Sequence, residues 1–360
     1  MRNATLSVAF FLANLVCAGA ALAGTATLSG NDLLFTANPG EVNHTLVLEE
    51  GLGFDVFDST APVTAGQGCA VVNANQAFCA KPNKKKKKMQ IRIVAGDMDD
   101  VLTLRAFTYR RARLEGDAGS DELKGGDGLN FLDGGLGADI FRGRRQTFLN
   151  VNHDVVDYSS RVAPVTVTLA DGTANEGEAG ENDRIDDRVD EIDGGHAQDT
   201  MSDDNRRFVL FYGKQGNDRL TGGLDYGGAG DDRLVCPRGL CELHGGGRDD
   251  VLRGAGSGDD MEGGSGDDKL VGRAGGDLMW GNAGIDIIRA GRSNDFVNGG
   301  SEADLIFGGK GRDRLLGTSG PDTIFARDGE RDNVNGGPGS DRARVDLTLD
   351  RLKRVEMLLA

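Results

Sequence analysis

The sequence predicts an all-β fold, an elongated solenoid of short strands joined by tight turns. Gly accounts for 57 of the 360 residues and Asp for 43 of the 57 acidic ones, a composition that suits turns rather than helices. Eleven nonapeptides follow one another without a gap from Gly227 to Phe325. Their eighth residue is apolar in every copy, so each short strand is expected to turn one side chain inward.

Composition and charge exclude several classes of protein. The 57 acidic against 41 basic residues give a formal net charge of −16, which disfavours binding to nucleic acid or to an anionic membrane. Apolar residues make up 38% of the chain, which argues against simple disorder. No apolar run after Ala23 is as long as a membrane-spanning helix, so we expect a soluble mature chain.

The segment 1–23 has the features of a secretory signal peptide. Arg2 precedes an apolar stretch from Leu6 to Val16, and Ala21-Leu22-Ala23 is a small-x-small cleavage site. We therefore expect the mature chain to begin at Gly24 and to be secreted. The alternative is an uncleaved membrane anchor, for which the apolar stretch is short.

The four cysteines that follow the signal peptide form two close pairs, Cys69 with Cys79 and Cys236 with Cys241. In an oxidising compartment these pairs are the natural disulfides, and we expect both to form. A metal site is the alternative, but neither pair has the CxxC spacing of zinc ligands, and the four His residues are scattered.

Residues 24–114 contain no clean nonapeptide and are expected to form a β-rich cap at the start of the solenoid. Stretches such as Thr45–Leu48 and Ile91–Val94, separated by Gly, Asn and Asp, are typical of short strands. Five consecutive lysines, Lys84–Lys88, fall in an expected loop beside the first disulfide. They form either a solvated loop or a contact for an anionic cell-surface polymer.

Residues 115–226 are expected to form an irregular stretch of the same solenoid. Three nonapeptides run from Gly116 to Arg142, and isolated copies follow at Gly194–Ser202 and Gly213–Thr221. Residues 143–193 interrupt the repeat with a strand-like segment and an acidic run. We expect this insert to add one strand-containing coil and then an acidic loop.

Residues 227–344 carry the regular repeat. Position one is Gly in nine of the eleven nonapeptides and position six is Asp in ten, which matches the pattern G-G-x-G-x-D-x-U-x. This region resembles the RTX, or hemolysin-type calcium-binding repeat, family of secreted bacterial proteins. The resemblance implies a right-handed parallel β-roll with Ca²⁺ bound between the turns of adjacent coils. Residues 345–360 are then expected to cap the open end of the roll.

The position-six aspartates are the candidate metal ligands. Two nonapeptides make one coil, so stacking places each Asp above that of the turn two nonapeptides away. Carboxylates stacked in this way repel one another, and a hard divalent cation held by carboxylate and carbonyl oxygens removes the repulsion. The alternative is that each Asp only caps its own turn by local hydrogen bonds. We predict several bound Ca²⁺ ions, with these ligands: Asp121, Asp139, Asp232, Asp250, Asp259, Asp268, Asp277, Asp286, Asp295, Asp304, Asp313 and Asp322.

Two turns depart from the repeat in ways that bear on metal binding. Arg248 stands at position four in place of Gly and brings positive charge to its turn, so the sites on either side of Asp250 are predicted to be the weakest. Cys241 replaces the Asp of its own repeat. There we expect the Cys236–Cys241 disulfide to hold the turn in place of an ion.

Motifs for catalysis are absent from the sequence. It contains neither the H-E-x-x-H of zinc proteases nor the G-x-S-x-G of lipases, so we expect no enzymatic activity. We predict a secreted protein that folds on binding Ca²⁺ and acts as a structural or surface-interaction module. Cell-surface polysaccharides and proteins are its candidate partners. The alternative is a carbohydrate-active lyase or epimerase of β-helix type, whose catalytic carboxylates would be hidden among many others.

Overall fold

The computed structural model describes residues 24–29, 32–50, 53–80, 90–105, 111–144, 153–169, 173–186, 188–203 and 209–359. The expected signal peptide, residues 1–23, and Lys84–Lys88 lie outside the described residues. Within the described ranges the chain forms 37 strands and no α-helix. Accordingly, these ranges hold no helix long and apolar enough to cross a membrane.

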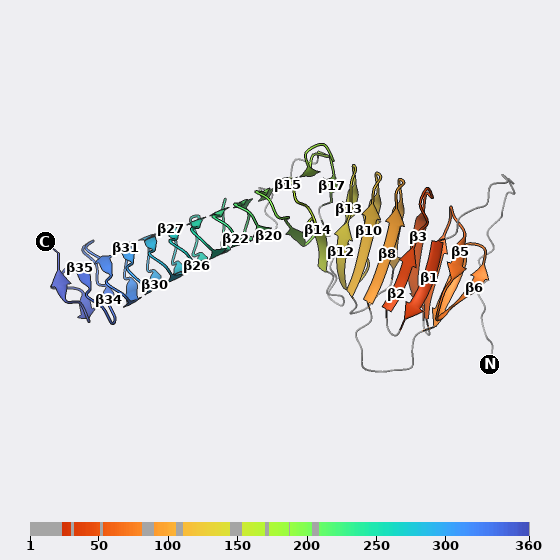
Figure 1. Cartoon of the computed structure of the whole chain (residues 1–360). Coiled ribbons are helices and arrows are strands. Elements are labelled where there is room, and N and C mark those ends of the chain that lie inside the picture. The colour runs from red at the N-terminus through yellow and green to blue at the C-terminus, as the bar shows by residue number, and fades with distance from the viewer. Residues whose placement is uncertain are drawn as a thin grey trace.

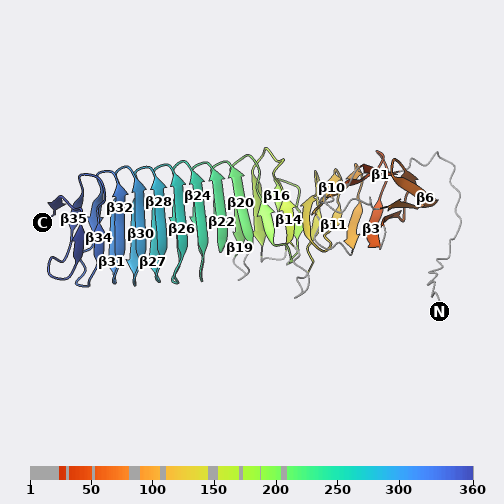
Figure 2. The same ribbon diagram turned by 90° about the horizontal axis from the view of Figure 1, so that it is seen from below.

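The strands stack along one axis into an elongated solenoid, with β1 and β6 near one end and β35 near the other (Figure 1). The broad faces of the sheets turn along this axis. Strands β8 and β10 are seen broadside in Figure 1, whereas the coils from β20 onward are seen broadside in Figure 2. A gradual twist of this kind is the usual behaviour of stacked β-strands. The all-β solenoid predicted from the repeat is confirmed.

Three sheets form the walls of the solenoid. One sheet contains 17 strands and runs the whole length: β1 (Gly24–Ser29), β2 (Asp32–Thr36), β5 (Val63–Ala65), β8 (Gln90–Gly96), β10 (Arg111–Asp117), β12 (Leu129–Asp133), β14 (His153–Asp157), β18 (Glu191–Asp193), β20 (Leu210–Gln215), β22 (Leu224–Ala229), β24 (Glu242–Gly247), β26 (Asp260–Ser265), β28 (Leu278–Ala283), β30 (Phe296–Ser301), β32 (Arg314–Ser319), β34 (Asn333–Asn335) and β36 (Arg351–Lys353).

The opposite wall consists of two sheets in succession. The first, toward the N-terminus, has eight strands: β3 (His44–Glu50), β4 (Gly53–Asp58), β6 (Cys69–Asn73), β7 (Gln76–Ala80), β9 (Val101–Arg105), β11 (Glu122–Lys124), β13 (Ile140–Arg142) and β17 (Arg184–Ile185). The second has twelve strands: β15 (Val165–Leu169), β16 (Gly177–Glu178), β19 (Thr200–Asp203), β21 (Arg219–Thr221), β23 (Arg233–Val235), β25 (Val251–Arg253), β27 (Lys269–Ala274), β29 (Ile287–Arg292), β31 (Leu305–Lys310), β33 (Thr323–Phe325), β35 (Arg342–Arg344) and β37 (Met357–Leu358).

Each coil of the regular roll is built from two nonapeptides, as the repeat predicts. Strand β26 pairs in parallel with β28, which places Met261 beside Met279, and β28 pairs with β30 in the same way. The position-eight residues fill the space between the two walls, and each is completely buried: Leu234, Leu243, Leu252, Met261, Leu270, Met279, Ile288, Val297, Ile306, Leu315 and Ile324. Burial of one such side chain contributes about 1.5–3 kcal/mol, and the stack repeats this contribution at every strand.

The turns of the roll need glycine because successive coils lie very close together. Gly264 and Gly266, at positions two and four of their repeat, have φ values of +119° and +128°. A Cβ atom on Gly266 would lie 2.1 Å from the carbonyl oxygen of Arg248 in the preceding coil. Glycine therefore serves both the backbone conformation and the stacking distance at these turns.

The N-terminal region combines antiparallel and parallel pairing. Strands β1 and β2, β3 and β4, and β6 and β7 form antiparallel pairs, and the Cys69–Cys79 disulfide joins the last of these. Strands β8 and β10 already pair in parallel, as do β3 and β9. The parallel stack therefore starts before residue 115, inside the segment expected to form the cap.

The insert at residues 143–193 is larger in structure than expected. It contributes β14 to β18, and because β14 and β18 are successive strands of the 17-stranded sheet, it spans more than one coil; its valines at 155, 156, 165 and 167 are all buried in the solenoid. Its Tyr158 is also buried, and the hydroxyl donates a 2.9 Å hydrogen bond to Oδ2 of Asp183. The second wall passes from the eight-stranded to the twelve-stranded sheet at this insert.

Parallel stacking also continues into the C-terminal segment. Strands β36 and β37 pair in parallel with β34 and β35. Their residues are exposed, because no further coil covers them within the described part of the chain. The segment expected as a cap thus consists of a last, thinly packed coil.

Candidate metal sites

The predicted ligands lie in two columns of buried aspartates, one at each edge of the roll where strands meet turns. The exposed fraction of these aspartates is at most 3%. The first column contains Asp232, Asp250, Asp268, Asp286, Asp304 and Asp322, and the second contains Asp259, Asp277, Asp295 and Asp313. Farther upstream, Asp121 and Asp139 are neighbours in the same manner.

Within each column, one carboxylate oxygen of each Asp accepts a hydrogen bond from the backbone of the neighbouring coil. The backbone N–H of Asp250 donates to Oδ1 of Asp268, and the N–H of Asp268 donates to Oδ1 of Asp286, both at 2.8 Å. The other steps of the two columns have the same geometry at 2.7–3.0 Å. These hydrogen bonds join coils, whereas the local cap considered above is seen at Asp259, whose Oδ2 accepts the N–H of Ala255.

The second carboxylate oxygen is the feature that points to a cation. Apart from that of Asp259, the Oδ2 atom of every predicted ligand is buried without a hydrogen-bond partner. At a representative turn, the Cβ position above Gly281 lies 2.1 Å from Oδ2 of Asp286 and 2.4 Å from the carbonyl oxygen of Gly299. Carboxylate and carbonyl oxygens from adjacent coils therefore converge on one small space. An oxygen-only donor set of this kind fits Ca²⁺.

The carboxylates in these columns hold their protons unusually tightly. Burial, together with the charges of Asp232 and Asp268, raises the pKa of Asp250 to about 8. Burial and the neighbouring carboxylates likewise raise the pKa of Asp304 to about 8, and burial raises that of Asp286 to about 6. Ionisation of these stacked carboxyl groups is therefore unfavourable on its own, and a bound cation would stabilise their charged form. Arg248, expected to bring positive charge to its turn, is exposed and does not offset the shift at Asp250.

A comparison with protein-family models identifies the repeat. The model for the RTX calcium-binding nonapeptide repeat (4 copies) matches residues 113–146, 210–225, 244–279, 271–306, 280–315 and 307–343. The chain therefore contains RTX calcium-binding nonapeptide repeats. Its roll is a calcium-binding module, as the resemblance implied. No curated protein matches the chain in a search of whole sequences.

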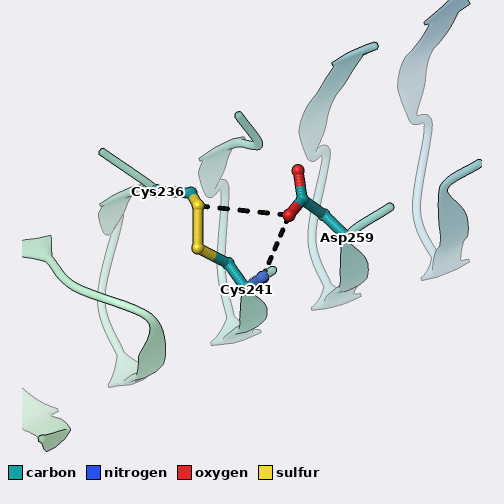
Figure 3. Close-up of side chains that lie close together, drawn as sticks. All are labelled: Cys236, Cys241 and Asp259. Carbon is teal, nitrogen blue, oxygen red and sulfur yellow. Dashed lines mark hydrogen bonds between the residues drawn. A yellow bond between two sulfur atoms is a disulfide. The ribbon is translucent and has the colours of Figure 1, made fainter. Parts of the chain in front are cut away.

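The RTX matches leave out residues 226–243, which contain the cysteine turn. Cys236 and Cys241 occupy positions one and six of their repeat, and they form a disulfide (Figure 3). In the other turns the position-six carboxylate lies directly over the position-one residue, so cysteines at these two places are already close enough to bond. Oδ1 of Asp259 accepts the N–H of Cys241 at 3.0 Å. The second column thus ends on a covalent link, and its oxidised sulfurs offer no thiolate to a metal.

The structure adds aspartates outside the predicted ligand set: Asp183 follows the upstream pair of Asp121 and Asp139, and Asp199 and Asp218 precede Asp232 in the first column. The N–H of Asp139 donates to Asp183, that of Asp199 to Asp218, and that of Asp218 to Asp232. These steps span 44, 19 and 14 residues, so a search at a strict spacing of two nonapeptides passes over them. Tertiary pairing keeps the stack in register although the loops differ in length.

Both columns also continue beyond Asp322 toward the C-terminus. The backbone N–H of Asp322 donates to Oδ1 of Asp341. Likewise the N–H of Asp313 donates to Oδ1 of Asp332, and the N–H of Asp332 to Oδ1 of Asp350. The Gly336-Gly337-Pro338-Gly339-Ser340-Asp341 sequence was a usable signal for Asp341. Asp332 and Asp350 follow no glycine-rich turn of this kind, and only their place in the stack reveals them.

Proposed function

We propose that this protein is a secreted RTX roll whose fold is completed by Ca²⁺ ions held between successive coils. The side-chain ligands are the predicted aspartates other than Asp259, both of whose carboxylate oxygens already accept backbone N–H groups, and turn carbonyls supply the remaining oxygens. The observation that carries the proposal is the series of buried, unpartnered Oδ2 atoms along both columns. In this role the protein is a structural or surface-interaction module, and catalysis is no part of it.

The energetics favour folding that depends on calcium. Two carboxylates at a strand spacing of about 4.8 Å repel each other by about 3 kcal/mol at an effective dielectric constant of about 20. Ca²⁺ removes this repulsion and satisfies the unpartnered oxygens. Extracellular calcium modules bind at about 10⁻⁴–10⁻³ M, which matches the calcium supply outside cells. Because the binding shell is assembled only by stacking, binding energy becomes folding energy.

Secretion is supported by two independent features. The segment 1–23 has the pattern of a cleavable signal peptide. The Cys69–Cys79 and Cys236–Cys241 disulfides suit an oxidising compartment. Sequencing of the N-terminus of the exported protein tests this part of the proposal, and we expect it to begin at Gly24.

A calcium titration of the full mature chain tests the central claim. Circular dichroism and the melting temperature are followed in EDTA, in Mg²⁺ and in rising Ca²⁺. We expect Ca²⁺ alone to increase the β signal and the melting temperature, and chelation to reverse both. No change at about 10 mM Ca²⁺, roughly tenfold above the weakest expected affinity, would refute the proposal.

One hollow on the 17-stranded sheet favours a second candidate, the modification of an acidic polysaccharide. Arg113, which lines a hollow of about 360 Å³, donates to Asp133 at 2.8 Å and to Asp157 at 2.5 Å. Burial raises the pKa of Asp133, whereas at Asp157 hydrogen bonds from Ser159 and Arg113 outweigh burial and lower its pKa. Carboxylates with opposite shifts are suited to acid and base roles.

This second candidate is tested with a panel of acidic polysaccharides in the presence of Ca²⁺. Release of unsaturated or epimerised products, and its loss in Asp133→Asn, would support enzymatic activity. Absence of product from the wild-type chain across the panel would leave the roll as a non-catalytic module.

A further inference from the structure

The strands of one wall of the roll carry only basic charges, although the chain as a whole is acidic. The strands β21, β23, β25, β27, β29, β31, β33 and β35 of the twelve-stranded sheet contain ten basic residues and no Asp or Glu. These residues are Arg219, Arg233, Arg253, Lys269, Arg273, Arg289, Arg292, Lys310, Arg342 and Arg344. We call this surface the basic face.

The opposite wall of the same coils has a different charge pattern. Its strands from β20 to β34 carry Glu242, Asp260 and Glu262, besides the buried Asp225, and only two basic residues, Lys214 and Arg314. The two walls lie on opposite sides of the roll, with β27 and β31 along one edge of the view in Figure 1 and β26 and β30 along the other. Among the strands from β20 to β35, positive charge is therefore concentrated on the twelve-stranded sheet.

The cations of the basic face are exposed and form no ion pairs among the described residues. Arg253, Lys269 and Arg289 are exposed, and each lies next in sequence to an inward residue of the core. None of the ten forms an ion pair with any residue that the structure describes. Arg289 lies over the ring of Phe307 at 4.8 Å from the ring centroid. Their charge is thus available to a partner.

The spacing of these cations suits a linear polymer. The five consecutive strands β21, β23, β25, β27 and β29 each turn one basic residue outward at position seven or nine. Neighbouring strands lie about 4.8 Å apart, so positive charges recur along the roll at about the length of one sugar unit. Half-buried apolar residues such as Val271 and Ile287 separate them and offer contact to the C–H faces of sugar rings. This row of cations on β21 to β29, the ladder, therefore matches a polysaccharide chain with one anionic group on each sugar.

We infer that the basic face binds a linear anionic polysaccharide laid along the roll axis. Arg recognises carboxylate and sulfate groups by paired N–H donors, which suits both kinds of acidic sugar. Exposed acids of the preceding turns, Asp231, Asp249 and Asp267, border the face. These acids confine the positively charged surface to a narrow strip, which disfavours binding of a bulky polyanion such as duplex DNA. The inference rests on the proposed function in one respect, because the ladder exists only while the roll is folded.

Binding of full-length protein in Ca²⁺ to defined polymers tests the inference. The probes are polygalacturonate, dextran sulfate, neutral dextran and a short DNA duplex. We expect binding to the two acidic polysaccharides, weakened by salt, and the two arms show whether carboxylate or sulfate is preferred. Equal binding to neutral dextran, or tighter binding to the DNA duplex than to either polysaccharide, would overturn the inference.

A triple variant locates the binding on the basic face. Arg253→Ser, Lys269→Ser and Arg289→Ser together remove three exposed contacts, and we expect affinity for the acidic polysaccharide to fall roughly tenfold or more. Circular dichroism in Ca²⁺ and in EDTA is recorded for the same samples. If the wild-type roll fails to respond to Ca²⁺, the result counts against the proposed function. If the wild-type roll responds to Ca²⁺ but does not bind the polymer, the result counts against this inference alone.

The matched control makes the same change of charge on the opposite wall. Arg314→Ser, Arg351→Ser and Lys353→Ser remove three exposed cations from the 17-stranded sheet. We expect affinity within about twofold of the wild type, since no ladder is disturbed. A loss equal to that of the basic-face variant would show that diffuse charge, not the ladder, attracts the polymer.

Discussion

The substitution Asp268→Asn is expected to change stability in opposite directions with and without calcium. Asn keeps an oxygen that accepts the N–H of Asp250, a 2.8 Å hydrogen bond in the structure. It removes one charge from the middle of the first column, between Asp250 and Asp286. The substitution therefore imitates the protonated form of Asp268 while removing a ligand for Ca²⁺.

The gain in the absence of calcium follows from the pKa of Asp268, which burial and the nearby Asp286 raise from 3.8 to about 7. A carboxyl group with a raised folded-state pKa stabilises the fold fully below its unfolded pKa and loses that effect as pH rises through about 7. Near pH 8 the charged group therefore costs stability, about 2 kcal/mol once solvent screening is allowed for. Asn removes this cost.

The loss in the presence of calcium follows from mass action. In the proposed arrangement Asp268 takes part in two intercoil Ca²⁺ sites, one with Asp250 and one with Asp286, its hydrogen-bonded neighbours in the column. At about 10 mM Ca²⁺ a site with an affinity of 10⁻⁴–10⁻³ M contributes about 1.4–2.7 kcal/mol. Weakening both sites is expected to cost about 3–5 kcal/mol, which exceeds the gain from the removed charge.

Thermal and urea unfolding of the wild type and variant, each in EDTA and in about 10 mM Ca²⁺, measures both effects. Asp267→Asn is the matched control, because it makes the same change of charge at the adjacent, exposed turn residue. We expect Asp268→Asn to raise stability in EDTA and lower it in Ca²⁺. A change of the same sign under both conditions, or an equal response of Asp267→Asn, would refute the assignment of the column as the calcium site.

The other predictions concern pH, turn geometry and the second disulfide. Without calcium the roll is expected to be more stable at about pH 5 than at about pH 8, because the raised pKa values of groups such as Asp250 and Asp304 mean that the folded state binds protons more tightly than the unfolded chain. A melting series in EDTA that shows higher stability at about pH 8 would contradict this. Arg248→Gly is expected to stabilise the roll by about 1 kcal/mol in urea unfolding, because Arg248 holds a φ of +81° that suits glycine; an unchanged midpoint would show that the backbone is not strained there. Replacing Cys236 and Cys241 by Ser is expected to lower stability by about 2 kcal/mol in non-reducing conditions, and a reducing agent should bring the wild type close to the variant.

The sequence alone was enough to predict the core and the two columns of the regular roll. The nonapeptide period fixes which side chain faces inward and which turns overlie one another, because every coil has the same length. Leu252 and Leu270 therefore appear at position eight, and Asp250 and Asp268 at position six, in any reading of the repeat. Local chain geometry and strand pairing determine these features without help from distant residues.

Tertiary structure alone decided which residues continue the columns where the period fails. Asp183, Asp218 and Asp332 join neighbours that lie 44, 14 and 19 residues away, because hydrogen bonding between coils tolerates loops of different length. It also decided where the charge lies. A net charge of −16 describes the chain as acidic throughout, whereas stacking buries the aspartates and turns Arg253 and Lys269 out to solvent on one wall. Composition adds up charge along the chain, and only the fold sorts that charge into a buried acidic lattice and an exposed basic face.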